Sequence, residues 1–195
     1  MSARQMVLAV LAVTAAAVAI IARGPLEQTM QRHMLVQLPM LFGTGILLGH
    51  AIARRSGVPA TRRGWNVQGV AGLLFVSGVL ATWMVPRALD AAVEHLVIDA
   101  LKLLSLVAAG MIALHSWRVA SAIVRTFVLG NMAWMTATIG MLLLDAPERL
   151  CTSYGASDQQ ETGIAMIALT IVGVVGAAVY AFWAPPAIAQ TARGE

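Results

Sequence analysis

The chain has 195 residues, of which 59% are hydrophobic and only 11% are charged, and its mean hydropathy is +0.79. Soluble domains carry about 25% charged residues, so the composition excludes an ordinary soluble fold. It predicts an all-α, polytopic membrane helical bundle, with residues 1–195 forming one integral membrane domain. Because Cys151 is the single cysteine, a disulfide framework and a cysteine-based zinc site are excluded. No glycine-rich phosphate loop, GxSxG or HExxH sequence is present, so we expect neither an enzyme nor a nucleic-acid partner.

Six apolar stretches are long enough to cross a bilayer, which takes about 20 residues of helix. We expect spans near residues 6–22, 34–53, 67–85, 96–114, 123–144 and 163–183. The connections hold helix breakers, among them Gly24-Pro25, Pro59, Pro86 and Pro147. The first stretch follows Arg4 as a signal peptide would, but its 17 apolar residues are long for one, so we expect a retained helix.

The distribution of arginine predicts the orientation. The loop between the second and third spans carries four arginines, which the positive-inside rule places in the cytoplasm together with both termini. The inner side then carries a charge of +7 and the outer side −3. This topology predicts a multi-pass protein of a bacterial inner membrane, in contact with lipid. The acidic outer side is either simply polar loop or a face for cations or for a basic periplasmic partner such as a cytochrome c.

Two charged residues lie inside the fourth span. Asp99 and Lys102 fall within about 40° of His95 on a helical wheel, so the three form one strip. Charges within a membrane cost about 2.5–3.5 kcal/mol each on insertion scales, and they mark functional sites by default. The strip is either a structural ion pair facing the bundle or a ligand or proton-relay strip that descends from the outer surface.

His33 has a methionine on each side at helical spacing, Met30 and Met34, so the three side chains lie within one turn. Thioether sulfur suits Cu(I) and imidazole suits copper generally, although methionine is also a common core residue. A pair of stacked haems on the four histidines is disfavoured. His33 and His50 do not share a helical face, and neither do His95 and His115.

Three segments together resemble the CtaG family of cytochrome c oxidase assembly factors, which are linked to copper delivery. The resemblance extends over about residues 30–170. Its elements are His33-Met34-Leu35 with Pro39-Met40-Leu41, then Trp83-Met84-Val85-Pro86 with Leu89-Asp90 and His95, and then Tyr154-Gly155 with Asp158-Gln159-Gln160 and Gly163. The chain departs from the family's paired histidines at HxxxH spacing, because Thr29 and Asp99 occupy the partner positions.

The resemblance implies a copper-handling assembly factor for a respiratory oxidase or related copper enzyme. Its metal site at the periplasmic face would use His33, His95, Asp158, Met30 and Met34. The alternative is a non-catalytic accessory subunit that packs against a larger membrane redox complex and holds no metal. Five glycines would permit its close helix contacts, namely Gly69, Gly72, Gly78, Gly173 and Gly176. A proton pathway through Asp99 and Lys102 ranks third and a haem protein fourth.

Overall fold

The computed structural model describes residues 3–56 and 66–183, and every element within these ranges is helical. The predicted all-α class is therefore confirmed. The elements in chain order are α1 (Ala3–Ile21), α2 (Arg23–Leu26), α3 (Met30–Arg32), the π-helical turn η1 (His33–Gln37), α4 (Leu38–Ser56), the 3₁₀ turn η2 (Val67–Gly69), α5 (Val70–Met84), α6 (Pro86–Glu94), α7 (Leu96–Val119), α8 (Ala122–Asp145) and α9 (Ala156–Trp183).

Four helical segments are long and apolar enough to cross a membrane: Met30–Ile52, Leu96–Val119, Ala122–Asp145 and Ala156–Val179. A fifth crossing results if α5 and α6 are one bent span. The apolar part of α1, Met6–Ile21, is shorter than the other four. The chain is thus a multi-pass helical membrane protein with four to five such segments in its described part. Six spans and the cytoplasmic position of the termini stay predictions.

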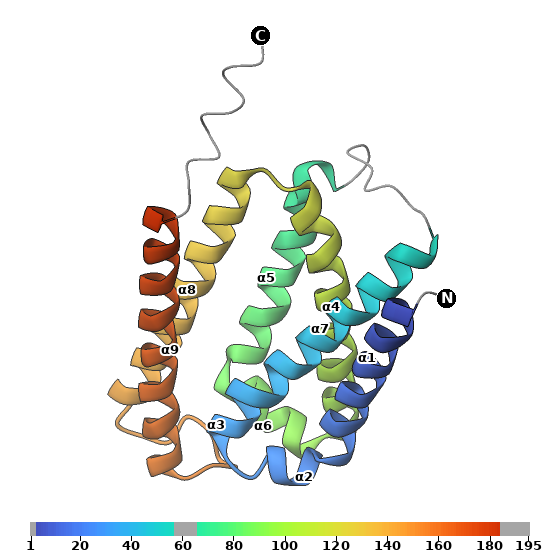
Figure 1. Ribbon diagram of the computed structural model, residues 1–195. Helices are drawn as coiled ribbons and strands as arrows, with labels where there is room; N and C mark the ends of the chain where they lie inside the picture. Colours follow the sequence, from blue (N-terminus) through green and yellow to red (C-terminus); the bar gives the residue numbers. More distant parts are fainter. Residues whose placement is uncertain (1–2, 57–65, 184–195) are drawn as a thin grey trace.

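The bend between α5 and α6 occurs at the predicted breaker, Pro86. Proline has no backbone N–H and forces the preceding residue out of helical geometry, and Val85 accordingly has φ −72° and ψ 123°. The two helices meet at 73°. As a result α6 turns aside and lies with α2 and α3 at one end of the molecule (Figure 1). We call this end, formed by α2, α3, α6 and residues 146–155, the short-helix end.

The closest helix crossing joins α4 to α7. A Cβ atom on Gly45 would lie 2.1 Å from the carbonyl oxygen of Val107, and one on Gly110 would lie 2.1 Å from that of Phe42. No side chain fits in such a space, so glycine at both positions lets the two backbones touch. This contact fixes α7, and with it Asp99 and Lys102, against the segment that carries His33.

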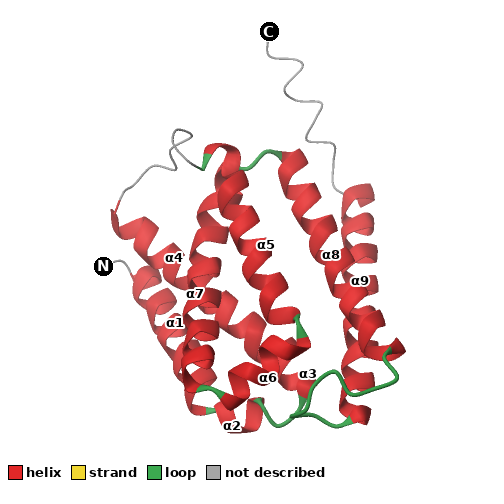
Figure 2. Ribbon diagram, turned by 180° about the vertical axis from the view of Figure 1, so that it is seen from behind, coloured by secondary structure: helices red, strands yellow, loops and turns green. Residues whose placement is uncertain are grey.

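The long helices form two groups. Helices α1, α4, α5 and α7 pack around one another, and α8 and α9 pair as an antiparallel hairpin beside them (Figures 1 and 2). The hairpin contacts the first group through α5 and, at the short-helix end, through α3. The buried core of hydrophobic side chains lies largely at this end and includes Met30, Leu89, Cys151 and Tyr154. The short-helix end is therefore where all parts of the chain meet.

Candidate functional site

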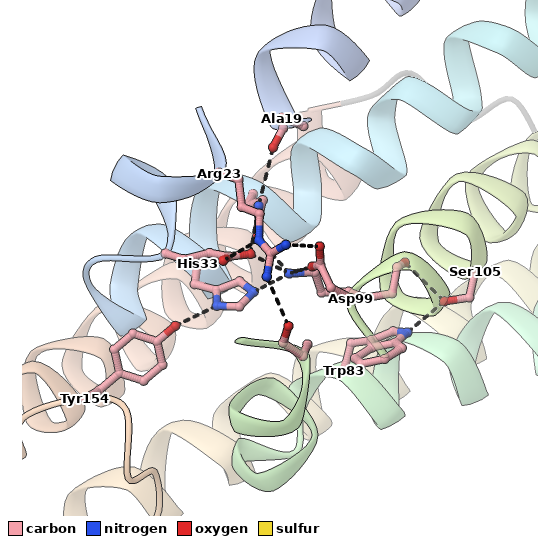
Figure 3. A network of polar contacts seen from close by, with 11 residues as sticks. Ala19, Arg23, His33, Trp83, Asp99, Ser105 and Tyr154 are labelled. Atoms are coloured by element: carbon pink, nitrogen blue, oxygen red, sulfur yellow. Dashed lines mark hydrogen bonds and ion pairs between the residues drawn. The ribbon is translucent and has the colours of Figure 1, made fainter. Parts of the chain in front are cut away.

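Four charged side chains at the short-helix end form a closed ring of alternating charge. Arg23 contacts Glu27 through Nε and Asp99 through Nη1, each at 2.9 Å. Lys102 Nζ contacts the same two carboxylates, also at 2.9 Å. We call these four residues the charge ring (Figure 3). Lys102 is fully buried, Glu27 and Asp99 are nearly so, and only Arg23 is substantially exposed, with 30% of its side chain accessible.

Lys102 has more acceptors around it than it has protons to donate. Its ammonium group donates to Glu27 Oε1 at 2.9 Å, to His33 Nε2 at 2.8 Å and to Gln37 Oε1 at 3.2 Å. These three bonds use all three N–H donors. Asp99 Oδ1 is then held by charge alone, since it makes no hydrogen bond within the described part of the chain. Lys102 is thus the hub that joins α7 to η1 and to the chain after α2.

His33 is held at both ring nitrogens. Because the ammonium of Lys102 donates to Nε2, the hydrogen-bond pattern assigns the ring proton to Nδ1. Nδ1 then donates to the hydroxyl of Tyr154 at 2.7 Å, and the two rings meet edge to face with centroids 6.3 Å apart. Figure 3 shows Tyr154 reaching His33 from the side opposite the charge ring. His33 therefore connects the ring to the segment that precedes α9.

The local backbone explains how these side chains converge. Arg23 and Glu27 are four residues apart around the short helix α2, and Asp99 and Lys102 are three apart on α7, so each ion pair is set by helical spacing. In η1 the backbone bond runs from the N–H of Leu38 to the carbonyl of His33, five residues back. This wider turn directs both His33 and Gln37 at Lys102. Such π-helical turns are rare and occur frequently at functional sites.

The carboxylate of Glu27 is ionised despite its burial. Burial by itself raises the pKa of Glu27, but hydrogen bonds from Arg23 and Lys102 outweigh it, and the net pKa lies below the ordinary 4.5. The hydrogen bond to Glu27 likewise raises the pKa of Arg23, against the opposing effect of burial. With all four groups ionised the ring carries no net charge, which is the condition for keeping such groups out of water.

A second set of polar contacts ties the loop of residues 146–155 to the rest of the short-helix end. Asp90 of α6 accepts the backbone N–H groups of Thr152 at 2.6 Å and Ser153 at 3.3 Å. Asp158 of α9 accepts the N–H of Met30 at 2.5 Å. These carboxylates satisfy backbone donors at the ends of neighbouring elements, so Tyr154 and Met30 are fixed on opposite sides of His33.

The buried core around His33 is rich in sulfur. Met30, Met34, Met166 and Cys151 are each at most 4% exposed and belong to the same hydrophobic cluster, against which Met40 and Met84 pack. The Cys151 thiol contacts the carbonyl of Pro86 at 3.4 Å, and burial raises its pKa to about 12. The thiol is therefore protonated at neutral pH and acts as a soft, uncharged donor.

The residues predicted as metal ligands are placed unequally. Met30, His33 and Met34 are all buried at this end, and Asp158 lies beside them through its bond to Met30. His95 is exposed, and its backbone joins α6 to α7. Among the described residues no three His, Cys, Asp or Glu side chains are spaced to hold a metal ion. The five-residue ligand set stays a prediction, and its buried part is confined to His33 and the two methionines.

The predicted ion pair between Asp99 and Lys102 is present, but it is only half of the charge ring. Sequence reasoning missed Arg23, Glu27, Gln37 and Tyr154. One signal was available, since Arg23 and Glu27 are an i,i+4 pair directly after an apolar helix. Gln37 was a second, because it is the lone amide in an apolar stretch.

No protein-family model matches this chain, and no curated protein or solved structure does either.

Proposed function

We propose that this protein is a copper-handling factor for the assembly of a respiratory oxidase or related copper enzyme, in a bacterial inner membrane. The π-helical turn η1 carries the proposal, because it sets His33 and Met34 beside Met30 within a buried, sulfur-rich core. Copper is the cargo in this proposal, taken up at the short-helix end and passed to the partner enzyme. That end faces the periplasm in the predicted orientation.

The donor chemistry favours Cu(I) over harder cations. Thioether and imidazole are ligands for copper, whereas carboxylates suit Mg²⁺, Ca²⁺ and Mn²⁺. Both carboxylates of the charge ring are already paired with Arg23 and Lys102, so they offer little to a divalent ion. Met30 and Met34 are the principal ligands in this proposal. His33 joins them when its Nδ1 proton leaves and the bond to Tyr154 is given up.

The other predicted ligands take supporting roles. Asp158 positions Met30 by accepting its backbone N–H, as a carboxylate around a metal site commonly positions a ligand. His95 is exposed at the same end, so we assign it contact with incoming copper. The charge ring holds η1 in place through Lys102.

A Cu(I) competition titration on the purified, detergent-solubilised protein tests the proposal. The double variant Met30→Leu, Met34→Leu keeps the side-chain volume but removes both thioethers, and volume-conserving changes of this kind are tolerated in cores. Met135→Leu, Met141→Leu, two methionines outside the cluster, is the matched control. We expect one tightly bound Cu(I) in the wild type and the control and at least ten-fold weaker binding in the cluster variant. Equal binding by all three proteins would contradict the proposal.

The accessory-subunit function has its own supporting observation. Gly69 and Gly72 pack tightly against Ser116, whereas a Cβ atom added to Gly78, Gly173 or Gly176 would have nothing within 4 Å among the described residues. Glycines that make no contact within the chain leave room for the helix of another protein. If this function is correct, the protein copurifies with a complex in mild detergent, and Gly173→Leu, Gly176→Leu releases it while Cu(I) binding is unchanged.

A further inference from the structure

The end of the bundle opposite the short helices contains a cavity lined only by hydrophobic side chains. Its volume is about 320 Å³, and it lies between α4, α5, α7 and α8. Phe42, Leu73, Leu114, Trp117, Leu129 and Met132 are among the residues that line it. Nothing polar in this lining offers a hydrogen bond to a sugar, nucleotide or peptide, so the occupant is hydrocarbon.

The volume decides which hydrocarbon. A helix with its side chains is about 10 Å across, so 320 Å³ corresponds to about 4 Å of its length. A partner helix crossing the membrane does not fit into that space. A flexible acyl chain does, and the cavity is open to the bilayer rather than enclosed.

Two arginines stand beside the cavity at the level of Trp117. The guanidinium of Arg125 lies over the Trp117 ring, 5.6 Å from its centroid, and Arg118 follows Trp117 in sequence. Nε of Arg125 is buried and has no hydrogen-bond partner among the residues that the structure describes. Arg118 Nη2 lies 3.1 Å from His50 Nε2, and the rest of its side chain is exposed. Both guanidinium groups therefore keep donors for an anion.

The sequence supplies no carboxylate to these arginines from the helices around the cavity. No Asp or Glu occurs between Glu27 and Asp90, or between Asp99 and Asp145. Helices α4 and α5 and the adjoining halves of α7 and α8 fall within these intervals. The charge at this end is thus positive without internal compensation, in contrast to the neutral charge ring at the short-helix end.

We propose that this cavity is a binding site for one anionic phospholipid, with an acyl chain in the hydrophobic cavity and the phosphate on Arg118 and Arg125. Basic pockets between membrane helices recognise anionic headgroups in this way. Trp117 lies at the boundary between the two parts, where an aromatic ring contacts both chain and headgroup. The site is independent of the proposed copper function, because it uses the other end of the molecule.

Native mass spectrometry of the full chain in a zwitterionic detergent tests the site. Phosphatidylglycerol and phosphatidylcholine with identical acyl chains are titrated separately. We expect one phosphatidylglycerol to be retained with at least ten-fold higher affinity than phosphatidylcholine, since each arginine near an anionic headgroup contributes roughly five-fold. Millimolar inorganic phosphate should not displace it, because free phosphate lacks the acyl chain.

Three variants separate the parts of the site. Arg118→Gln, Arg125→Gln should remove the preference for phosphatidylglycerol. The control Arg87→Gln, Arg149→Gln, which changes two exposed arginines outside the described cavity, should keep it. Ala113→Phe fills the cavity and should abolish binding of both lipids. Equal affinity of the wild type for the two lipids, or an equal loss in the control variant, would overturn the proposal, and neither result depends on the filled variant folding.

Discussion

The two ends of this bundle use cationic side chains in opposite ways. At the short-helix end Arg23 and Lys102 each bridge the same two carboxylates, and the four charges cancel. At the other end Arg118 and Arg125 flank a hydrophobic cavity in a region whose helices carry no acid. The difference teaches that a cation compensated within the chain stabilises the fold, whereas an uncompensated one is left for something outside the chain.

Lys102→Met should have the largest effect on stability. It leaves Glu27 and Asp99 buried with Arg23 as their one cationic partner, and breaking a buried ion pair on one side costs about 3–5 kcal/mol. The free energy of unfolding in mixed detergent measures the loss. The double variant Lys102→Met, Glu27→Gln restores charge balance and should regain at least half of it. If the two variants are equally unstable, packing rather than charge explains the role of Lys102.

Tyr154→Phe should have an intermediate effect. It removes the acceptor for Nδ1 of His33 and leaves a buried N–H group without a partner, which costs about 1–3 kcal/mol. The same unfolding measurement applies. Tyr180→Phe, on α9 and outside the described side chains, is the matched control and should change stability little. An unaltered Tyr154→Phe protein would mean that His33 is not held by this bond.

The pH dependence of stability should report Glu27. Its pKa is lower in the folded protein than the ordinary 4.5, so its contribution is fully present above pH 4.5 and is lost as the pH falls through the lowered value. Unfolding measured between pH 7 and pH 3 should therefore show stability falling in the acid range. Glu27→Gln should reduce that slope. An unchanged slope in the variant would assign the acid sensitivity to other carboxylates.

Arg118→Gln, Arg125→Gln should have the smallest effect on stability. Neither arginine has a carboxylate partner in the surrounding helices, and exposed substitutions of this kind change stability by about 0.5 kcal/mol or less. Unfolding in a detergent without added lipid measures this. Adding phosphatidylglycerol should then stabilise the wild type and not the variant, because a ligand stabilises the state that binds it. A large loss without lipid would contradict the contrast between the two ends.

Composition and periodicity were sufficient to predict the helical membrane class, the break at Pro86 and the pairing of Asp99 with Lys102. These features depend on hydropathy, on proline chemistry and on spacing within one helix. The partners of Lys102 depend instead on how distant segments pack, since Glu27 and His33 lie 75 and 69 residues away in sequence. The π-helical turn was also out of reach, because residues 33–37 read as ordinary helix and are widened by their contacts.

The central claim is that the core around His33 binds copper through its methionines. X-ray absorption at the copper K-edge of the Cu(I)-loaded protein tests it most directly, because sulfur and nitrogen ligands give distinct scattering. The account predicts two sulfur neighbours and one imidazole, with the sulfur signal lost in Met30→Leu, Met34→Leu. A spectrum with only nitrogen and oxygen neighbours, or one that the double substitution leaves unchanged, would contradict it.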